Sequence, residues 1–436
     1  MLSAGLAVLC ILLVNPSSIA AFAWFFCAWS MVAILLFRDE LPNFTFAFLV
    51  NSAFIAIYVF VQSKTYPDTY GTTSPLSTSW TDDSYFFTLA ADRFPPDLLS
   101  RPLYWEYSHI FASLVRMSTP LSIEHPLDVL FFQSGTAALL STYTGRFMRQ
   151  LSGDSQLGRT AYLFALLCPF LMMNGGVVFL RDTLAAALLI FSLSLLRDGR
   201  YLVAACAVAL QVALRPGTGI LVLPVYAIVY SREIRNFTGR HPTAAGGTAI
   251  VLALGLAIGA PYVLEWLAAT YSVESIGLLG REVIADLTAD PDANALYLSI
   301  QQQPFLVRLL LNGAYIFLYP FFTLRTVLNA DHFDVRNVLL SVVIPVYTVW
   351  LNAWFVAGAT SGRVFMERQR EIVIALVAAL MLIGIYSLQT RHKTMIYPLY
   401  YLLVTIGFAR ATPLARRFGY VVASALFLIQ LAANLR

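Results

Sequence analysis

Long apolar runs separated by short polar connections repeat along the whole chain. A helix needs about 20 apolar residues to cross the ~30 Å hydrocarbon core of a membrane, and most of these runs approach that length. The pattern predicts an all-α polytopic membrane protein, with a single integral membrane domain over residues 1–436 and a bundle of about 11 to 14 transmembrane helices. We expect spans near residues 2–14, 19–37, 43–62, 127–143, 160–179, 183–196, 201–214, 218–230, 248–267, 305–324, 338–356, 372–388, 395–408 and 420–435.

The composition excludes a soluble domain. Hydrophobic residues make up 59% of the chain and charged residues 12%, with a mean hydropathy of +0.72, whereas about a quarter of the residues in soluble proteins are charged. The net charge of +4 is small, and no basic cluster with interleaved aromatic residues indicates a nucleic-acid partner. The cysteines lie in apolar runs without metal-ligand spacing, so we expect packing roles for Cys10, Cys27, Cys168 and Cys206.

Two long polar intervals, residues 63–126 and 268–304, interrupt the predicted spans. Acidic residues outnumber basic ones in both intervals, whereas the short loop 145–159 has three arginines and only one acidic residue, Asp154. Basic residues accumulate in short cytoplasmic loops, so we place this loop in the cytoplasm and both long intervals outside. The acidic residues of the first interval are Asp68, Asp82, Asp83, Asp92, Asp97, Glu106 and Glu124.

The connections after residue 305 can be assigned to the two sides of the membrane in two ways. If every later run crosses the membrane, the basic triplet Arg391-His392-Lys393 lies on the cytoplasmic side, and residues 363–370 and 410–417 lie outside. If one run is re-entrant or interfacial, the triplet moves to the outer side. Lysines and arginines are divided too evenly between the two sets of connections to decide between these solutions.

The first outer interval contains a helical pattern of its own, over residues 103–116. Apolar residues recur at helical spacing and polar residues fall on the opposite face, so we expect an amphipathic helix lying on the outer membrane surface. A second short helix is expected after Asp83, and together the two would frame a lateral entrance for a lipid. The apolar face is Leu103, Tyr107, Ile110, Phe111 and Leu114, and the polar face is Glu106, His109, Ser113 and Arg116.

The stretch SWTDDSYF at residues 79–86 holds two adjacent carboxylates, Asp82 and Asp83, followed by Tyr85. Polar groups at the end of a bundle of apolar helices, near the membrane surface, suit chemistry on a membrane-borne substrate. Aspartate is also a preferred helix N-cap, so we assign Asp83 as a general base and Asp82 as the cap or a second ligand. Paired carboxylates also suit a divalent metal, which stays an open alternative; no cofactor is established by the sequence.

Arg181 and Arg215 border apolar spans and share the outer side with the aspartates if all the spans from 127 to 230 cross. A guanidinium binds phosphate through a bidentate fork, so both are candidate phosphate ligands. Each has a structural alternative, because Arg181 could pair with Asp182 and either side chain could extend to the headgroup region.

Further candidates lie elsewhere on the chain. Arg391 belongs to the densest cationic group and is the third candidate phosphate ligand. Glu106 is the second-choice carboxylate. His109 and Tyr85 are candidate substrate contacts, and His109 is also typical of a solvated interfacial residue.

Several segments resemble GT-C type glycosyltransferases, which are integral membrane enzymes that use polyprenyl-phosphate-linked sugars. The resemblance rests on TDDSYF at 81–86, FLRDTLAAALLIFSLSLLRDGRY from 179, ALRPGTGILVLP from 213 and QTRHKTMIYPLYYLL from 389. It implies a catalytic carboxylate at Asp82 or Asp83, with Arg181, Arg215 and Arg391 near the donor phosphate. The segment from Arg181 also resembles the Arg-led helix of EpsG and Wzy type polysaccharide polymerases.

The resemblance implies an inverting membrane glycosyltransferase of the bacterial plasma membrane. It would move a sugar from a polyprenyl-linked donor to a lipid-linked or polymeric glycan acceptor at the periplasmic or exterior face. One alternative is a Wzy or EpsG type polymerase or ligase, which shares the chemistry. The other is a transporter of lipid or solute, for which a polar path through the middle of the membrane is expected.

Overall fold

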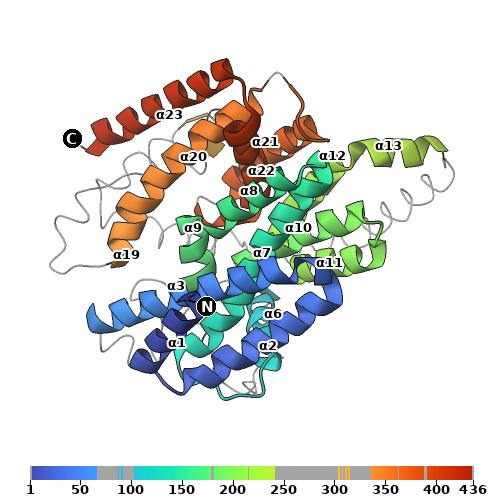
Figure 1. Cartoon of the computed structure of the whole chain (residues 1–436). Coiled ribbons are helices and arrows are strands. Elements are labelled where there is room, and N and C mark those ends of the chain that lie inside the picture. Colours follow the sequence, from blue (N-terminus) through green and yellow to red (C-terminus); the bar gives the residue numbers. More distant parts are fainter. Residues whose placement is uncertain are drawn as a thin grey trace.

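The computed structural model describes residues 2–65, 103–177, 181–214, 216–240, 335–361, 363–386 and 390–434, with isolated positions between 87 and 91 and between 303 and 314. Within these residues the protein is all-α, as the apolar runs predict (Figure 1). The helices pack around a main hydrophobic core that draws on the N-terminal, central and C-terminal parts of the chain, for example Phe48, Phe131, Ile190 and Tyr401. The second outer interval, residues 268–304, lies almost wholly outside the described residues.

The N-terminal helices follow the first three predicted spans: α1 (Leu2–Val14), α2 (Ser18–Phe37) and α3 (Leu41–Thr65). Proline cannot continue a helix, and Pro16 separates α1 from α2. A 3-10 turn, η1 (Arg38–Glu40), reverses the chain. α2 and α3 then pack antiparallel through aromatic pairs, with ring centroids 6.1 Å apart for Phe22–Phe48 and 5.6 Å apart for Phe37–Phe44.

The central helix is α7 (Pro126–Ser152), which is buried along most of its length and extends well past the predicted end at residue 143. His125 and Asp128 form a capping box at its start, and Gly153, with a φ of 68°, ends it in the left-handed conformation that glycine tolerates. Its buried hydroxyls donate to carbonyls one turn earlier, as Thr144 does to Leu140. A helix with this many polar residues can therefore lie in the middle of the bundle.

The predicted span 160–179 is wrong as a single helix. α8 (Ser155–Leu166) ends before Cys168, and α9 (Pro169–Met172) leads into a π-helical turn, η2 (Met173–Val177). Pro169 lacks the N–H that would continue α8, which explains the break. The next three helices follow the prediction closely: α10 (Asp182–Arg197), α11 (Tyr201–Leu214) and α12 (Pro216–Val229). The projecting helix α13 (Ser231–Arg240) lies where a connection was expected (Figure 1).

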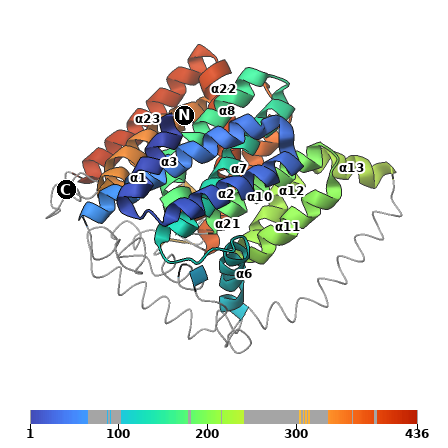
Figure 2. The same cartoon turned by 60° about the horizontal axis from the view of Figure 1, so that its bottom comes forward.

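The predicted amphipathic helix is present as α6 (Leu103–Met117), at the edge of the bundle below α10 and α11 (Figure 2). The second half of this helix packs against the bundle. Phe111 and Val115 are fully buried, and the Phe111 ring lies 6.3 Å from that of Phe132 on α7. The position of the helix on the outer membrane surface stays a prediction. In the second predicted helix, Phe87 and Ala90 are helical and buried.

The C-terminal helices are packed unusually closely. Small residues line the contacts: a Cβ on Gly358 or Gly407 would overlap the backbone of the facing helix, and a Cβ on Gly419 would overlap Ala353. Such small-residue contacts let membrane helices approach each other closely. The elements are α19 (Val335–Val338), the π-helical turn η3 (Leu339–Val343), α20 (Ile344–Ala359), α21 (Gln369–Tyr386), η4 (Thr390–Ile396), α22 (Tyr397–Arg410) and α23 (Pro413–Asn434).

Three helical stretches among the described residues are long and apolar enough to cross a membrane: Ser18–Lys64, Leu339–Ala359 and Pro413–Ala432. The first contains both α2 and α3. Their exposed surfaces carry large apolar side chains, such as Leu35, Val346 and Val421. These stretches indicate a membrane protein.

Ion pairs gather where α7, α10 and α22 end. We call this end of the bundle the Asp154 end. We call the opposite end, where α7 and α10 begin, the Arg181 end. Asp154 follows α7, and its carboxylate pairs with Arg410 at the end of α22 (2.6 Å). The other pairs join Arg146 to Asp198 (2.8 Å), Arg232 to Glu371 (2.7 Å), Arg149 to Glu40 and Arg197 to Glu367.

These contacts decide the question of sidedness after residue 305. Arg410 pairs with Asp154, and the Glu367 N–H donates to the Leu151 carbonyl (2.9 Å), so residues 363–371 and 410 lie at the same end as the loop 145–159. Uninterrupted alternation, which places them on opposite sides, is therefore wrong. α22 has 14 residues and rises about 21 Å from its start to this end. The basic triplet in η4 thus lies toward the Arg181 end.

Candidate functional site

The structure describes part of the predicted site. Asp82, Asp83, Tyr85 and Arg215 lie outside the described residues. Glu106 and His109 lie on α6, and Arg391 on η4, where the structure describes the backbone. Arg181 is described with its side chain.

Arg181 lies directly before α10, and its guanidinium reaches the end of α11. Its Nη1 atom donates to the carbonyl of Leu214, the last residue of α11, at 2.9 Å. A cation is favoured here because the carbonyls at a helix C-terminus carry partial negative charge. The bond joins the start of α10 to the position just before Arg215, as expected if the two arginines share a side. The bond also gives Arg181 a structural role, which is separate from its predicted role as a phosphate ligand.

The second cationic element is Lys393 in η4, which packs against α10. Lys393 is only 3% exposed, and its Nζ lies 4.9 Å from the ring centroid of Phe170 and 5.6 Å from that of Tyr397. An ammonium over the face of an aromatic ring is attracted by the ring quadrupole. The fold therefore holds the Lys393 amino group inside the bundle, at a depth set by α9 and the start of α22.

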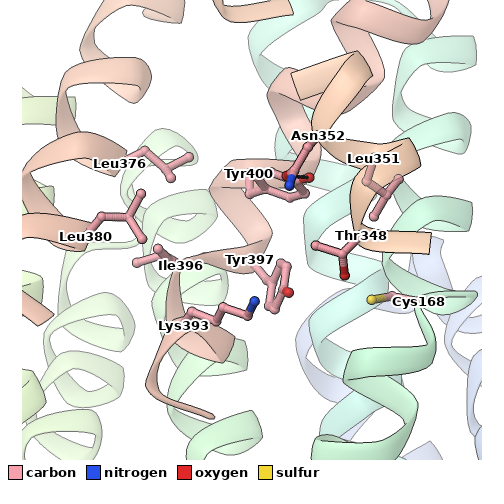
Figure 3. A pocket seen from close by; sticks show the side chains of 10 residues that line it. All are labelled: Cys168, Thr348, Leu351, Asn352, Leu376, Leu380, Lys393, Ile396, Tyr397 and Tyr400. Carbon is pink, nitrogen blue, oxygen red and sulfur yellow. Dashed lines mark hydrogen bonds between the residues drawn. The ribbon is translucent and has the colours of Figure 1, made fainter. Parts of the chain in front are cut away.

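Lys393 lines a small cavity between α20, α21 and the η4–α22 segment (Figure 3). Its free volume of about 20 Å³ is enough for about one water molecule and too small for a sugar. Polar and apolar side chains both line it. The lining residues are Cys168, Thr348, Leu351, Asn352, Leu376, Leu380, Lys393, Ile396, Tyr397 and Tyr400.

Polar groups on one face of α20 meet the cavity. Thr348 and Asn352 are four residues apart, so both point to the same side of the helix. The Tyr400 hydroxyl donates to the side-chain amide oxygen (Oδ1) of Asn352 at 2.7 Å and fixes both side chains (Figure 3). An ammonium beside oriented hydroxyl and amide groups suits an anionic or hydroxyl-rich group more than an apolar one.

Sequence reasoning missed part of this arrangement. It noted Lys393 only within the basic triplet, assigned Cys168 to helix packing and did not single out Thr348, Asn352 or Tyr400. Two signals were present in the chain. Cys168-Pro169 marks a helix break inside an apolar run, and Thr348 and Asn352 are polar residues at helical spacing inside another.

Among the described residues, no group of histidine, cysteine, aspartate and glutamate side chains could hold a metal ion. The aspartate doublet lies outside those residues, so the metal alternative at Asp82 and Asp83 stays a prediction. No family model matches the chain, and no curated protein or solved structure matches it either. The residues of this chain are therefore the only ground for a functional proposal.

Proposed function

We propose that this protein is a GT-C type membrane glycosyltransferase with about 11 to 14 spans. It would transfer a sugar from a polyprenyl-phosphate-linked donor to a lipid-linked or polymeric glycan acceptor. The observation that carries the proposal is the position of the cationic groups. Arg181 and the η4 segment with Arg391 and Lys393 lie toward one end of the bundle, where a leaving phosphate would need them.

The arginines at the Asp154 end support an assignment of each end of the bundle to one side of the membrane. Exposed arginines gather at the Asp154 end, among them Arg38, Arg159, Arg363 and Arg417. Short basic connections favour the cytoplasm, so this end faces the cytoplasm and the Arg181 end faces the periplasm or exterior. The long acidic interval with Asp82 and Asp83 then shares the outer side with Arg181.

The mechanism assigns one task to each group. Asp83, with Asp82 as cap or second ligand, takes the proton from the acceptor hydroxyl as it attacks the anomeric carbon. The bond to the donor phosphate breaks, and the phosphate keeps the electron pair. Arg181, Arg215 and Arg391 stabilise that growing negative charge. A direct displacement of this kind inverts the configuration at the anomeric carbon.

The decisive experiment measures lipid phosphate released from a panel of polyprenyl-phosphate and polyprenyl-diphosphate sugars by the protein in nanodiscs. Asp83→Asn keeps the shape of the side chain and removes the proton acceptor, so turnover should fall by about 10²-fold or more. Asparagine and aspartate cap helices about equally well, so a mere N-cap would leave turnover unchanged. Full activity in Asp82→Asn, Asp83→Asn and the double variant would refute the base and leave Glu106 to test.

The cationic groups have a separate test. Arg215→Ala removes a guanidinium from the proposed phosphate site, and loss of a charge-assisted contact should weaken donor binding by about tenfold or more. Arg181→Lys keeps the charge and loses the planar fork, so donor affinity should fall here too. Because Arg181 also bonds to Leu214, thermal stability is measured beside affinity. Unchanged donor affinity in both variants would assign these residues to packing.

A transporter is the second candidate, because one observation favours it. The crossing formed by α8, α9 and η2 is broken at Cys168-Pro169, and the polar cavity with Lys393 adjoins this break. Transporters place substrate sites at broken helices. Movement of a labelled lipid or solute across proteoliposomes, without release of lipid phosphate, would favour this alternative over sugar transfer.

A further inference from the structure

An aromatic patch lies near the Asp154 end, on the side of the bundle formed by α8, α20, α22 and α23. We define it by five residues: Phe164, Trp350, Trp354, Phe408 and Tyr420. Their ring centroids lie 5.2 Å apart for Trp354–Tyr420, 5.4 Å for Trp354–Phe408, 5.4 Å for Phe164–Phe408 and 5.9 Å for Phe164–Trp350. Trp350, Phe408 and Tyr420 are 40%, 44% and 46% exposed. The patch therefore has an exposed outer part, Trp350, Phe408 and Tyr420, over two buried rings, Phe164 and Trp354.

Arginines border this patch, and acidic residues are scarce around it. The guanidinium carbon of Arg416 lies 5.9 Å from the Trp354 ring centroid, and Arg417 is exposed. No aspartate or glutamate occurs anywhere from residue 372 to residue 436. The nearby carboxylate of Asp154 is engaged by Arg410. The positive charge of Arg416 and Arg417 is thus not balanced by an acidic partner among the described residues.

Two buried donors, one in the patch and one on the bordering Arg416, also lack an acceptor among the described residues. Trp354 is 7% exposed, and neither its Nε1 atom nor the Nε atom of Arg416 has a hydrogen-bond partner. The other side of the Arg416 guanidinium is used, since Nη2 donates to the Phe408 carbonyl at 3.1 Å. Burying a donor without an acceptor is costly, and more so when the donor is charged. An oxygen-rich anion would satisfy both donors at once.

We infer that the aromatic patch, together with Arg416 and Arg417, binds the phosphodiester headgroup of an anionic glycerophospholipid in the leaflet at the Asp154 end. Arginine suits phosphate oxygens, and tryptophan and tyrosine favour the headgroup level of a membrane. Both donor atoms are covered in the free protein, so the partly exposed Arg416 side chain turns outward to meet the phosphate, which opens the way to the Trp354 indole N–H.

The surrounding surface favours a lipid over a soluble anion. Along α8 and its C-cap, Arg159, Leu163 and Leu167 are spaced by four residues and all are exposed, so two leucines continue the surface from the charged end toward the middle of the bundle. On α23, Val421 and Leu428 are exposed by 66% and 64%. Acyl chains can lie along these apolar side chains while the headgroup stays with the arginines. The site is independent of the proposed sugar transfer, which is placed at the other end.

The test compares lipid binding by the wild type with that of two single variants. Trp354→Phe keeps an aromatic ring and removes the indole N–H, and Arg416→Gln removes the guanidinium. Arg38→Gln is the matched control, because Arg38 is an exposed arginine at the same end of the bundle. Arg38 directly follows α2, which lies on the opposite side of the bundle from α23 (Figure 1).

Delipidated protein is titrated with dioleoyl phosphatidylglycerol or dioleoyl phosphatidylcholine, and bound lipid is counted by native mass spectrometry. The wild type and Arg38→Gln should bind the anionic lipid more tightly than the zwitterionic one. Each patch variant should lose about tenfold in affinity for phosphatidylglycerol, with phosphatidylcholine binding unchanged. The melting temperature of each lipid-free variant shows whether it is folded. Trp354 and Arg416 lie on different helices. If one variant unfolds, the lipid affinity of the other still tests the inference.

Three outcomes would overturn the inference. Equal binding of the two lipids would mean that the patch takes any lipid. Wild-type affinity for phosphatidylglycerol in a folded patch variant would place the headgroup elsewhere. Competition by inorganic phosphate at concentrations comparable to those of the lipid would identify a soluble anion as the ligand.

Discussion

Arg368 holds two parts of the Asp154 end together, and its substitution tests both its contacts and its backbone. It lies just before α21, and its side chain is 2% exposed. Its Nη1 atom donates to the Val229 carbonyl at 2.6 Å and to Glu233 at 2.8 Å, and its Nη2 atom also contacts the Glu233 carboxylate. The guanidinium carbon lies 4.5 Å from the Tyr230 ring centroid. Arg368 therefore links the start of α21 to the turn between α12 and α13.

The loss on removing these contacts can be bounded. Hydrogen bonds to charged groups contribute about 1.5 to 3 kcal/mol, and a cation over an aromatic ring about 0.5 to 2 kcal/mol. These terms do not add, and Glu233 is 49% exposed, so water compensates part of the loss. We expect Arg368→Ala to lower the free energy of unfolding by about 2 to 3 kcal/mol.

The backbone makes the prediction sharper. Arg368 has a φ of 62°, in the left-handed region that a residue with a Cβ disfavours by about 1 to 2 kcal/mol. Arg368→Gly removes this strain, and the greater freedom of glycine in the unfolded chain offsets about 0.4 to 1 kcal/mol of the gain. Arg368→Gly should therefore be more stable than Arg368→Ala by about 0.5 to 1 kcal/mol, although both lose the same contacts.

The matched control is Arg370, two residues later, which is exposed and helical. There the usual order should hold, with the glycine variant less stable than the alanine variant by about 1 kcal/mol. Reversible unfolding in mixed micelles, followed by circular dichroism, measures all four variants. Greater stability of Arg368→Ala than of Arg368→Gly, as at Arg370, would refute the strained backbone.

Other predictions concern packing and pH. Gly407→Ala should destabilise the protein by about 1 to 3 kcal/mol, because the new methyl group would overlap the Trp354 backbone. Gly5→Ala is the control and should not destabilise the protein, because nothing lies within 4 Å of its new methyl group. Equal melting temperatures of the two variants would contradict the prediction for Gly407. Ser18→Ala should cost about 1.5 to 3 kcal/mol through the lost hydrogen bond to Asp128, measured by the same unfolding assay, and a neutral effect would contradict this. The hydrogen bond from Arg410 lowers the pKa of Asp154, so the pair should stabilise the fold above the unfolded pKa of about 4 and weaken as pH falls through the lower folded value. A pH titration of the melting temperature checks this, and Asp154→Asn should flatten the change.

Much of the fold is determined locally and can be read from the chain. Apolar runs of sufficient length determine the helices, and a helix boundary follows where proline removes an N–H or glycine accepts a left-handed turn, as at Pro16 and Gly153. The amphipathic pattern of α6 likewise predicted a helix at its observed position. Candidate residues such as Arg181 can be found in this way because a charge beside an apolar run is costly and therefore conspicuous.

Only the tertiary structure decided how distant residues meet. Charge counts could not place the basic triplet, and the Arg410–Asp154 pair placed it because that contact joins residues far apart in the chain. The same holds for Arg181 with Leu214, for the cavity around Lys393 and for Trp354 beside Arg416. Hydropathy averages neighbouring residues, so it reports that a segment is buried without reporting its partner. Which polar groups share a site depends on helix crossings, and these are set by packing between segments.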